Sequence, residues 1–245
     1  MSLIVGRNTV IEALSQNKNL DKILLYRDAH GEGIGDIRRL AKQRNIPIQH
    51  VPVEKLNAMT KTQHQGVIAL GALIQYYEVQ AVLDHIYSKG EVPLLLVLDG
   101  ITDVRNIGAI ARTALCCSVH GIIIPNTGIA SLQEDAIKAS AGALGKIMVC
   151  RVNSLAKTLD DLHLNGLHIV ASEMKAKHNV FDIDFALPTA IIMGSEDKGI
   201  QPIVQKIADQ SFKIPIPGGF ESFNVSVATG MVLYEVIKQR MKKCS

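Results

Sequence analysis

The sequence predicts an α/β protein in which a small domain precedes a larger domain built on an open parallel sheet. From residue 92 onward, short apolar runs alternate with amphipathic helical patterns, which is typical of buried parallel strands joined by helices. Residues 1–74 show a shorter alternation of their own and carry ten Lys and Arg against six Asp and Glu, whereas the remainder has a net charge of −1. We therefore expect domains at 1–74 and 92–245, joined by a linker at 75–91.

The elements of the first domain follow from two kinds of spacing. Helical periodicity covers residues 8–15 and 34–43, and extended runs cover 22–26, 47–51 and 66–72. Together they predict a compact α/β unit of about 75 residues. The basic balance of this unit favours a module that anchors RNA, although a solvated basic surface explains the same balance.

The larger domain is read in the same way. Six apolar runs predict parallel strands at 94–98, 121–124, 147–150, 168–171, 190–193 and 212–214. Helical patterns lie at 107–117, 132–140 and 155–162, the end of the chain predicts a long helix at 225–242, and a further helix at 79–87 falls in the linker. Ligands of such sheets bind beyond the carboxyl ends of the strands. The loops after Leu98, Met193 and Ile214 are therefore the candidate sites.

Composition excludes several classes of protein. The longest strongly apolar run, residues 94–98, is far shorter than the ~20 residues that span a membrane. The four cysteines, Cys116, Cys117, Cys150 and Cys244, form no zinc-type spacing with each other or with histidines. We expect a cytoplasmic protein with reduced thiols, no metal and no membrane partner.

The first loop opens a helix and carries two candidate side chains. It reads LDGITDVRNIGAIARTA, with Asn106 placed just before the helix and Arg112 within it. Asn106 is either the N-cap of that helix or a site residue, and Arg112 is either a surface cation or a site residue. Six residues correspond to 240° on a helical wheel, so the two side chains meet only if both lean toward one cleft.

The other two loops combine glycines with polar residues. GSEDKG, residues 194–199, follows a buried strand, and its glycines either allow a ligand to approach the backbone closely or form an ordinary strand-to-helix turn. IPIPGGFESFNVSVATG, residues 214–230, leads into the last helix, for which Ser222 or Asn224 is the expected cap. Gly230 costs that helix about 1 kcal/mol relative to Ala, which suggests close packing there.

The three loops together carry a family resemblance. N-x-G-x-x-x-R-T-A, then G-x-E-x-x-G, then IPIPGGFESFNVSVA occur in this order within about 93–243 and resemble the signature motifs of the SpoU (TrmH-type) 2′-O-ribose RNA methyltransferases of the SPOUT superfamily. The front segment has G-R-N-x-V near its start and H-Q-G at 64–66. It resembles the ribosomal-protein-like RNA-binding domain of the branch that methylates a guanosine ribose in 23S rRNA.

The resemblance implies a fold, a cofactor and an assembly. The parallel sheet would contain a deep trefoil knot, and S-adenosylmethionine (SAM) would bind bent against the main chain of the second and third loops. The implied cofactor residues are Gly194, Ser195, Gly199, Ile214, Gly218 and Phe223. A homodimer formed through the knotted region and the final helix, acting on rRNA or else tRNA, is also implied. Two positions depart from the family's usual pattern, with Val104 in place of Pro and Phe223 in place of Leu.

The resemblance also implies catalytic roles. Arg112 is the central residue, and because an Arg stays protonated we favour electrostatic stabilisation over action as a general base. Asn106 would orient Arg112 or the ribose, Glu196 would hold the loop or the Arg, and Asn224 and Ser226 would line the site. Two rival functions are less well supported: an oxidoreductase would need a G-x-G-x-x-G motif after an early strand, and a non-catalytic RNA-binding scaffold would not need this set of side chains.

Overall fold

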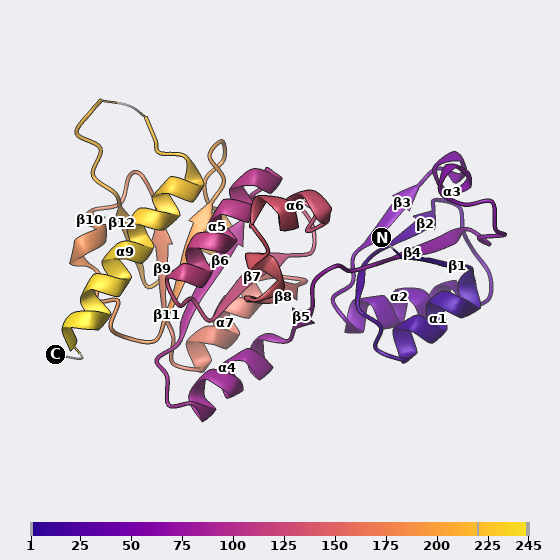
Figure 1. Ribbon diagram of the computed structural model, residues 1–245, viewed down its shortest axis with the longest axis horizontal. Coiled ribbons are helices and arrows are strands. Elements are labelled where there is room, and N and C mark those ends of the chain that lie inside the picture. Colours follow the sequence, from indigo (N-terminus) through magenta and orange to yellow (C-terminus); the bar gives the residue numbers. More distant parts are fainter. Residues whose placement is uncertain (1, 220, 244–245) are drawn as a thin grey trace. The chain divides into compact units, whose positions relative to one another are not determined.

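The computed structural model describes residues 2–219 and 221–243, and Cys244 lies outside them. The chain forms two compact units, Met1–Gln75 and Tyr76–Ser245 (Figure 1). Each unit has its own sheet and its own hydrophobic core. The predicted α/β class with a parallel sheet in the larger unit is confirmed.

The first unit is a four-stranded sheet with helices on both faces. Its strands lie in the order β1-β4-β2-β3; β2 runs parallel to β3 and antiparallel to β4. The elements are β1 (Leu3–Val5), α1 (Arg7–Ser15), β2 (Leu20–Tyr26), α2 (Ile34–Gln43), β3 (Ile48–Val51), α3 (Val53–Met59) and β4 (Val67–Gly71).

Successive side chains of β2 point to opposite faces of the sheet, and each face is covered by different helices. Ile23 and Leu25 pack in the cluster with α1 and α2, whereas Leu24 packs on the opposite face with Leu56 of α3. The predicted helices and strands of this unit are present within two residues of their expected ends. The short elements β1 and α3 were not predicted, because three to seven residues hold too little periodicity to be recognised.

The second unit is an eight-stranded sheet in the order β10-β12-β9-β11-β6-β7-β8-β5, and all of its strand pairs are parallel. Its strands are β5 (Tyr76–Tyr77), β6 (Leu94–Asp99), β7 (Gly121–Pro125), β8 (Met148–Val152), β9 (His168–Ser172), β10 (His178–Asn179), β11 (Thr189–Gly194) and β12 (Gln210–Lys213). Its helices are α4 (Val79–Ser88), α5 (Val104–Cys116), α6 (Glu134–Ala139), α7 (Leu155–Leu164), α8 (Pro202–Gln205) and α9 (Val225–Lys243), with short 3-10 turns at Ala143–Gly145 and Val180–Asp182.

Helices cover both faces of this sheet. Residues of α4, α7 and α8 share one core cluster with alternate residues of the central strands, while α5, α6 and α9 lie together on the other face (Figure 1). The last strand differs from its prediction, because β12 begins at Gln210 and ends before Ile214. Its first two residues are polar, since they lie toward the end of the sheet where burial is incomplete.

The stretch 75–91, which the sequence analysis assigned to a linker, contains β5 and α4. Tyr76 pairs with Val149 of β8, and α4 buries Val82, Leu83 and Ile86 in the core of the second unit. The apolar positions of this stretch therefore have a partner that its loose sequence pattern does not reveal. The structure divides the chain after Gln75.

Arg240 fastens the end of α9 to the amino end of the sheet. Its guanidinium donates hydrogen bonds to the carbonyl oxygens of Phe185, Val92, Pro93 and Leu187, at distances of 2.8–3.2 Å. Burial lowers the pKa of this group below its usual value. Within residues 2–219 and 221–243, no helix combines the length and apolar character needed to cross a membrane.

Candidate functional site

The first helix of the site, α5, is capped by Asp103 and not by Asn106. The Asp103 carboxylate accepts a hydrogen bond from the main-chain N–H of Arg105 at 2.7 Å, so the helix begins at Val104. The hydrogen bond from the Arg105 guanidinium also lowers the pKa of Asp103. Asn106 is therefore the third residue of the helix, and the interpretation of Asn106 as an N-cap is wrong.

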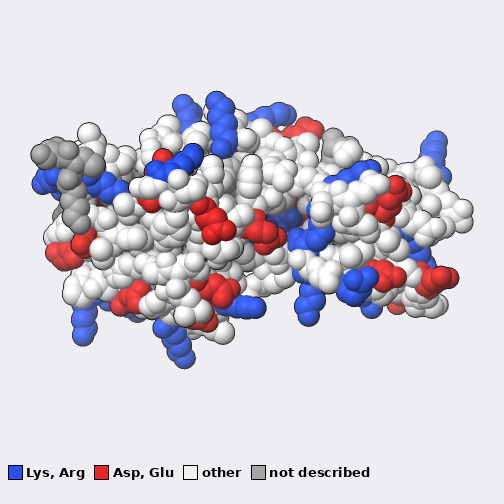
Figure 2. Space-filling model, turned by 90° about the horizontal axis from the view of Figure 1, so that it is seen from below, with Lys and Arg blue, Asp and Glu red and all other residues white. Residues whose placement is uncertain are grey.

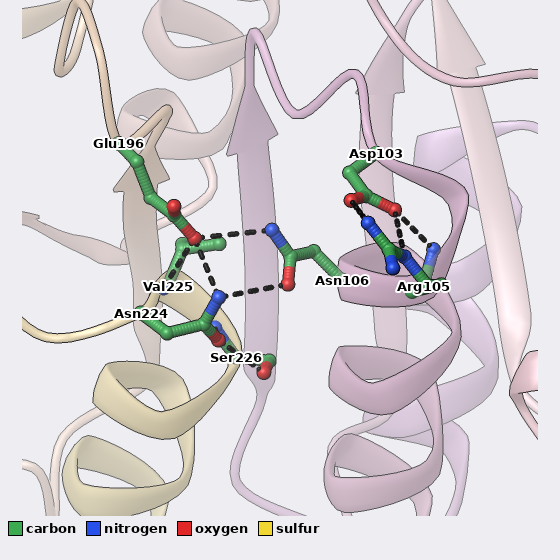
Figure 3. Close-up of polar contacts among 7 residues, drawn as sticks. All are labelled: Asp103, Arg105, Asn106, Glu196, Asn224, Val225 and Ser226. Carbon is green, nitrogen blue, oxygen red and sulfur yellow. Dashed lines mark hydrogen bonds and ion pairs between the residues drawn. The ribbon is translucent and has the colours of Figure 1, made fainter.

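Because Asp103 caps α5, the Asn106 side chain is able to join a polar network that connects three segments far apart in the sequence (Figure 3). Glu196 Oε1 accepts hydrogen bonds from Asn106 Nδ2 at 3.1 Å, from Asn224 Nδ2 at 2.7 Å and from the main-chain N–H of Val225 at 3.1 Å. Asn224 Nδ2 also donates to Asn106 Oδ1 at 3.0 Å. One carboxylate oxygen thus holds the start of α5 against the start of α9.

Asn224 has two functions in this network. Its Oδ1 accepts the N–H of Ser226 at 3.0 Å and the Ser226 hydroxyl at 2.5 Å, which is the bonding of an N-cap. Its amide group faces Glu196 and Asn106. Of the two caps expected for the final helix, the structure selects Asn224. The cap fixes the amide in the orientation that the network requires.

The loop that carries Glu196 is held at both ends. Ser195 and Gly199 bond each other's main chain across the turn, and a side chain on Gly194 would meet Gly199 and Ile200 backbone atoms at 2.4–2.6 Å. At the far end, the buried carboxylate of Asp99 accepts the main-chain and side-chain N–H groups of Gln201 at 2.7 and 2.6 Å. The close approach expected of a ligand at Gly194 is made by the chain itself, and these contacts constrain the backbone on both sides of Glu196.

A cavity of about 380 Å³ opens beside this network. It lies beyond the carboxyl ends of β9, β11 and β12, where parallel sheets bind ligands. Of the cofactor residues that the sequence predicts, five line it: Gly194, Ser195, Gly199, Ile214 and Phe223. Gly218 does not line it and is exposed. Glu196 lies on its wall, so the polar network and the cavity form one site.

Arg112 stands apart from the network. It lies six residues beyond Asn106 on α5, is exposed, and has no hydrogen-bond or ion-pair partner among the described residues. Arg105, seven residues earlier and on nearly the same face of α5, is instead paired with Asp103 at 2.8 Å. The structure therefore brings Asn106, Glu196 and Asn224 together and does not include the Arg112 guanidinium in their network.

One wall of the cavity was not predicted from the sequence. It is formed by the last residue of β9 and the segment that follows, together with a residue of α8 and one of the third loop, namely Ser172, Glu173, Met174, Lys175, Gln205 and Ile216. The signal was present, because this segment also follows the carboxyl end of a predicted parallel strand. No glycine or motif drew attention to it.

Two known protein families match this chain. The model of the SpoU rRNA Methylase family matches residues 93–234, and the model described as RNA 2′-O ribose methyltransferase substrate binding matches residues 3–77. The chain belongs to the SpoU family of RNA methyltransferases. All three loops of the site lie within the first match, and the first unit coincides with the second.

Relatives and solved structures agree with membership of the SpoU family. YacO of Bacillus subtilis (strain 168), whose name places it in the TrmH family of tRNA/rRNA methyltransferases, is 36% identical over 97% of this chain and 95% of its own. The SpoU methyltransferase AviRb from Streptomyces viridochromogenes, solved in complex with AdoMet, is 22% identical with a TM-score of 0.63, covering 98% of this chain and 90% of AviRb. The TrmH/SpoU tRNA modifying enzyme of A. aeolicus is 26% identical with a TM-score of 0.56, covering 67% and 86%.

Proposed function

We propose that this SpoU protein transfers a methyl group from SAM to the 2′-hydroxyl of a guanosine ribose in 23S rRNA. The observation that carries the proposal is the network of Asn106, Glu196 and Asn224, which joins three separate loops at the wall of a cavity. The unpaired Arg112 on the same helix adds a cation for the RNA. The family membership supplies the reaction class.

The cavity suits SAM in size and in chemistry. Its volume of about 380 Å³ falls within the range of small-molecule sites, and its walls combine apolar side chains such as Ile214, Ile216 and Phe223 with main-chain polar groups of the second and third loops. The lining carries acidic side chains at Glu173, Glu196 and Asp197 and basic ones at Lys175 and Lys198, so it offers partners for both the cationic and the anionic groups of SAM. When bound, SAM supplies an electrophilic methyl group on a positively charged sulfur.

Arg112 would act on the RNA and not on the cofactor. A ribose hydroxyl becomes a nucleophile as its proton leaves, and negative charge then develops on the 2′-oxygen. A guanidinium can hold the adjacent phosphate through two parallel hydrogen bonds and stabilise that charge at the same time. Because Arg remains protonated, we assign the proton to a phosphate oxygen or to water.

The network would place the ribose. Asn106 and Asn224 are fixed by Glu196, so their amide groups and the Ser226 hydroxyl present donors and acceptors at defined positions. Fixed groups of this kind lower the entropic cost of aligning two reactants. Asn106 makes no hydrogen bond to Arg112, which favours its role toward the ribose.

The first unit would supply RNA affinity. Five of its basic residues have exposed side chains with no hydrogen-bond or ion-pair partner among the described residues: Lys18, Arg27, Arg38, Lys55 and Lys61. On the face that Figure 2 displays, basic and acidic side chains are interspersed. On this face, contact with RNA would therefore depend on individual cations.

We further propose that the protein is a homodimer paired through α9. Val227, Met231, Tyr234 and Met241 are 40–68% exposed and recur every three, four or seven residues along this helix. That spacing places them in one stripe, as in helices that pack against a partner. Light scattering at micromolar concentration should give twice the chain mass, and Tyr234→Glu should give the chain mass. A wild-type monomer would contradict the dimer without affecting the assignment of the reaction.

Two experiments test the reaction. Calorimetry should show that the purified protein binds SAM and its demethylated product but not NAD. Deletion of the gene, followed by mapping of 2′-O-methyl groups, should remove a guanosine methylation from 23S rRNA in the cytoplasm. Loss of a tRNA methylation would replace the proposed substrate, and NAD binding without SAM binding would overturn the proposed function.

A further inference from the structure

The wall that the sequence analysis missed carries a carboxylate. Glu173 follows β9 directly, and its main-chain N–H bonds to the carbonyl oxygen of Phe212 in β12 at 2.8 Å. The residue is therefore fixed at the carboxyl end of two neighbouring strands. Its half-buried side chain lines the cavity.

Two side chains hold this carboxylate, one on each oxygen. Gln205 of α8 donates to Oε2 at 2.5 Å, and the Ser211 hydroxyl of β12 donates to Oε1 at 2.7 Å. A carboxylate has about four acceptor sites on its two oxygens, so each oxygen keeps acceptor capacity beyond these bonds. The result is a pair of adjacent acceptors whose orientation is set before any ligand arrives.

The other acidic residues of the cavity are placed differently. Glu196 uses one oxygen to hold Asn106, Asn224 and Val225, and Asp197 is exposed on the turn between Ser195 and Gly199. Neither is held on both oxygens by hydrogen bonds from the described residues. Glu173 is thus the acidic group whose two oxygens are positioned to receive two donors from one ligand.

We infer that Glu173 recognises the two adjacent ribose hydroxyls of the adenosine group of the cofactor. This rests on the proposed function. A vicinal diol presents two O–H donors side by side, which matches two neighbouring acceptors, and acidic residues bind ribose hydroxyls in other nucleotide-binding sheets. An ammonium group or an adenine amine has all its donors on a single nitrogen. It therefore matches the two neighbouring carboxylate oxygens less well than a vicinal diol does.

The test compares ligands that share the diol but differ elsewhere. SAM carries the sulfonium charge and the amino acid, S-adenosylhomocysteine has the amino acid without the charge, and 5′-methylthioadenosine has neither. In the full-length protein, Glu173→Gln should weaken all three by a similar factor, about 10-fold to 100-fold, because hydrogen bonds to a charged acceptor are lost. Titration calorimetry measures each dissociation constant.

A ligand without the ribose 2′-hydroxyl tests the contact between Glu173 and the diol directly. Wild-type protein should bind 2′-deoxy-5′-methylthioadenosine more weakly than 5′-methylthioadenosine, whereas Glu173→Gln should discriminate less between the two. Glu173→Asp, which keeps the charge but shortens the side chain, should also lose affinity for all three diol ligands. Glu134→Gln, at an exposed residue of α6 outside the cavity lining and outside the three loops, is the control and should bind as wild type. Unchanged melting temperatures of the free variants show that the fold is intact.

The outcomes separate the inference from the function on which it rests. A loss for SAM alone would assign Glu173 to the sulfonium charge, and a loss for SAM and S-adenosylhomocysteine but not 5′-methylthioadenosine would assign it to the amino acid. Equal binding by wild type and Glu173→Gln would also overturn the inference, although the proposed function would stand. Wild-type protein that binds none of the three ligands would overturn the proposed function itself.

Discussion

Two polar hubs, one in each unit, join segments that are far apart in sequence, but they use their side chains differently. In the first unit, Arg7 donates to the carbonyl oxygens of Gln65 and Glu32, and its own N–H bonds to the Gln65 side chain. In the second unit, Asn106, Glu196 and Asn224 bond mainly to one another at the wall of a cavity.

The difference teaches how a motif should be interpreted. The G-R-N and H-Q-G motifs of the first unit meet at Arg7 and Gln65, where the guanidinium bonds to main-chain oxygens and so contributes to the fold. Arg44 is used in the same way, on the carbonyl oxygens of Leu14 and Lys18. In the second unit the N-x-G-x-x-x-R motif leaves Arg112 without a partner among the described residues. A basic residue therefore counts toward RNA binding only when its donors are free.

The largest effect is expected from truncating the chain within the second unit. A chain that begins at residue 92 lacks Val82, Leu83 and Ile86, whose burial contributes about 5 kcal/mol or more. That is comparable to the whole stability of a domain. We expect residues 92–245 not to fold, whereas residues 76–245 should fold, bind SAM, and bind RNA more weakly and with a smaller salt slope than the full chain.

Circular dichroism and RNA titrations at several salt concentrations measure these differences. Equal RNA affinity and salt slope for residues 76–245 and for the full chain would show that the first unit does not anchor RNA. A cooperative melting transition for residues 92–245 would mean that α4 is dispensable.

The next largest effect is expected at Arg112. Arg112→Lys keeps the charge but loses the two-pronged hydrogen bonding, so single-turnover methyl transfer at saturating RNA should fall by about 10²-fold or more. Arg112→Ala should lose at least as much, while SAM affinity should hardly change in either variant. Arg105→Ala is the matched control, because that guanidinium is already paired with Asp103, and its rate should stay within a few-fold of wild type.

An Arg112→Lys enzyme running at the wild-type rate would refute the role of the guanidinium fork. Loss of SAM binding in either Arg112 variant would instead indicate that Arg112 is needed for the fold.

Two arginines of the first unit test whether bonded and free donors have different roles. The donors of Arg7 are bonded, and those of Arg38 are free of partners among the described residues. Arg7→Ala removes the two guanidinium hydrogen bonds that join distant segments and should lower the free energy of unfolding by about 1–3 kcal/mol. Arg38→Ala, an exposed residue of α2 without a partner among the described residues, should leave stability within ~0.5 kcal/mol and reduce RNA affinity. Thermal melting measures the effect on stability, and filter binding measures the effect on RNA affinity. The reverse result would show that Arg7 binds RNA and that Arg38 stabilises the fold.

The smallest effect concerns Gly230 in α9. A methyl group there would lie 3.7 Å from Thr113 Cγ2, an ordinary contact, so Gly230→Ala should raise the stability of the folded chain by about 1 kcal/mol. Gly108→Ala is the contrasting variant, because its methyl group would meet Ala139 and Ser140 atoms at 2.5–2.8 Å and should destabilise the protein. If Gly230→Ala lowers stability or dissociates the dimer, the close packing suggested by this glycine lies across the dimer interface.

The sequence by itself determined the class of the fold and the residue types of the site. Periodicity identified the long helices and the buried strands because those elements repeat their pattern over many residues. The rule that ligands bind at the carboxyl ends of parallel strands directed attention to the loops that carry Asn106, Glu196 and Asn224. The motifs then identified the family, to which the sequence comparisons confirm that the chain belongs.

Only the tertiary structure decided how these residues are used. Asn106 could be judged as cap or site residue only when Asp103 was seen to cap α5, because both interpretations fit the same local sequence. The assignment of α4 to the second core, the fixation of Arg7 by carbonyl oxygens and the two donors on Glu173 all depend on partners that lie far away in the sequence. Local sequence specifies the elements, but which donors are consumed and which stay free depends on what packs beside them.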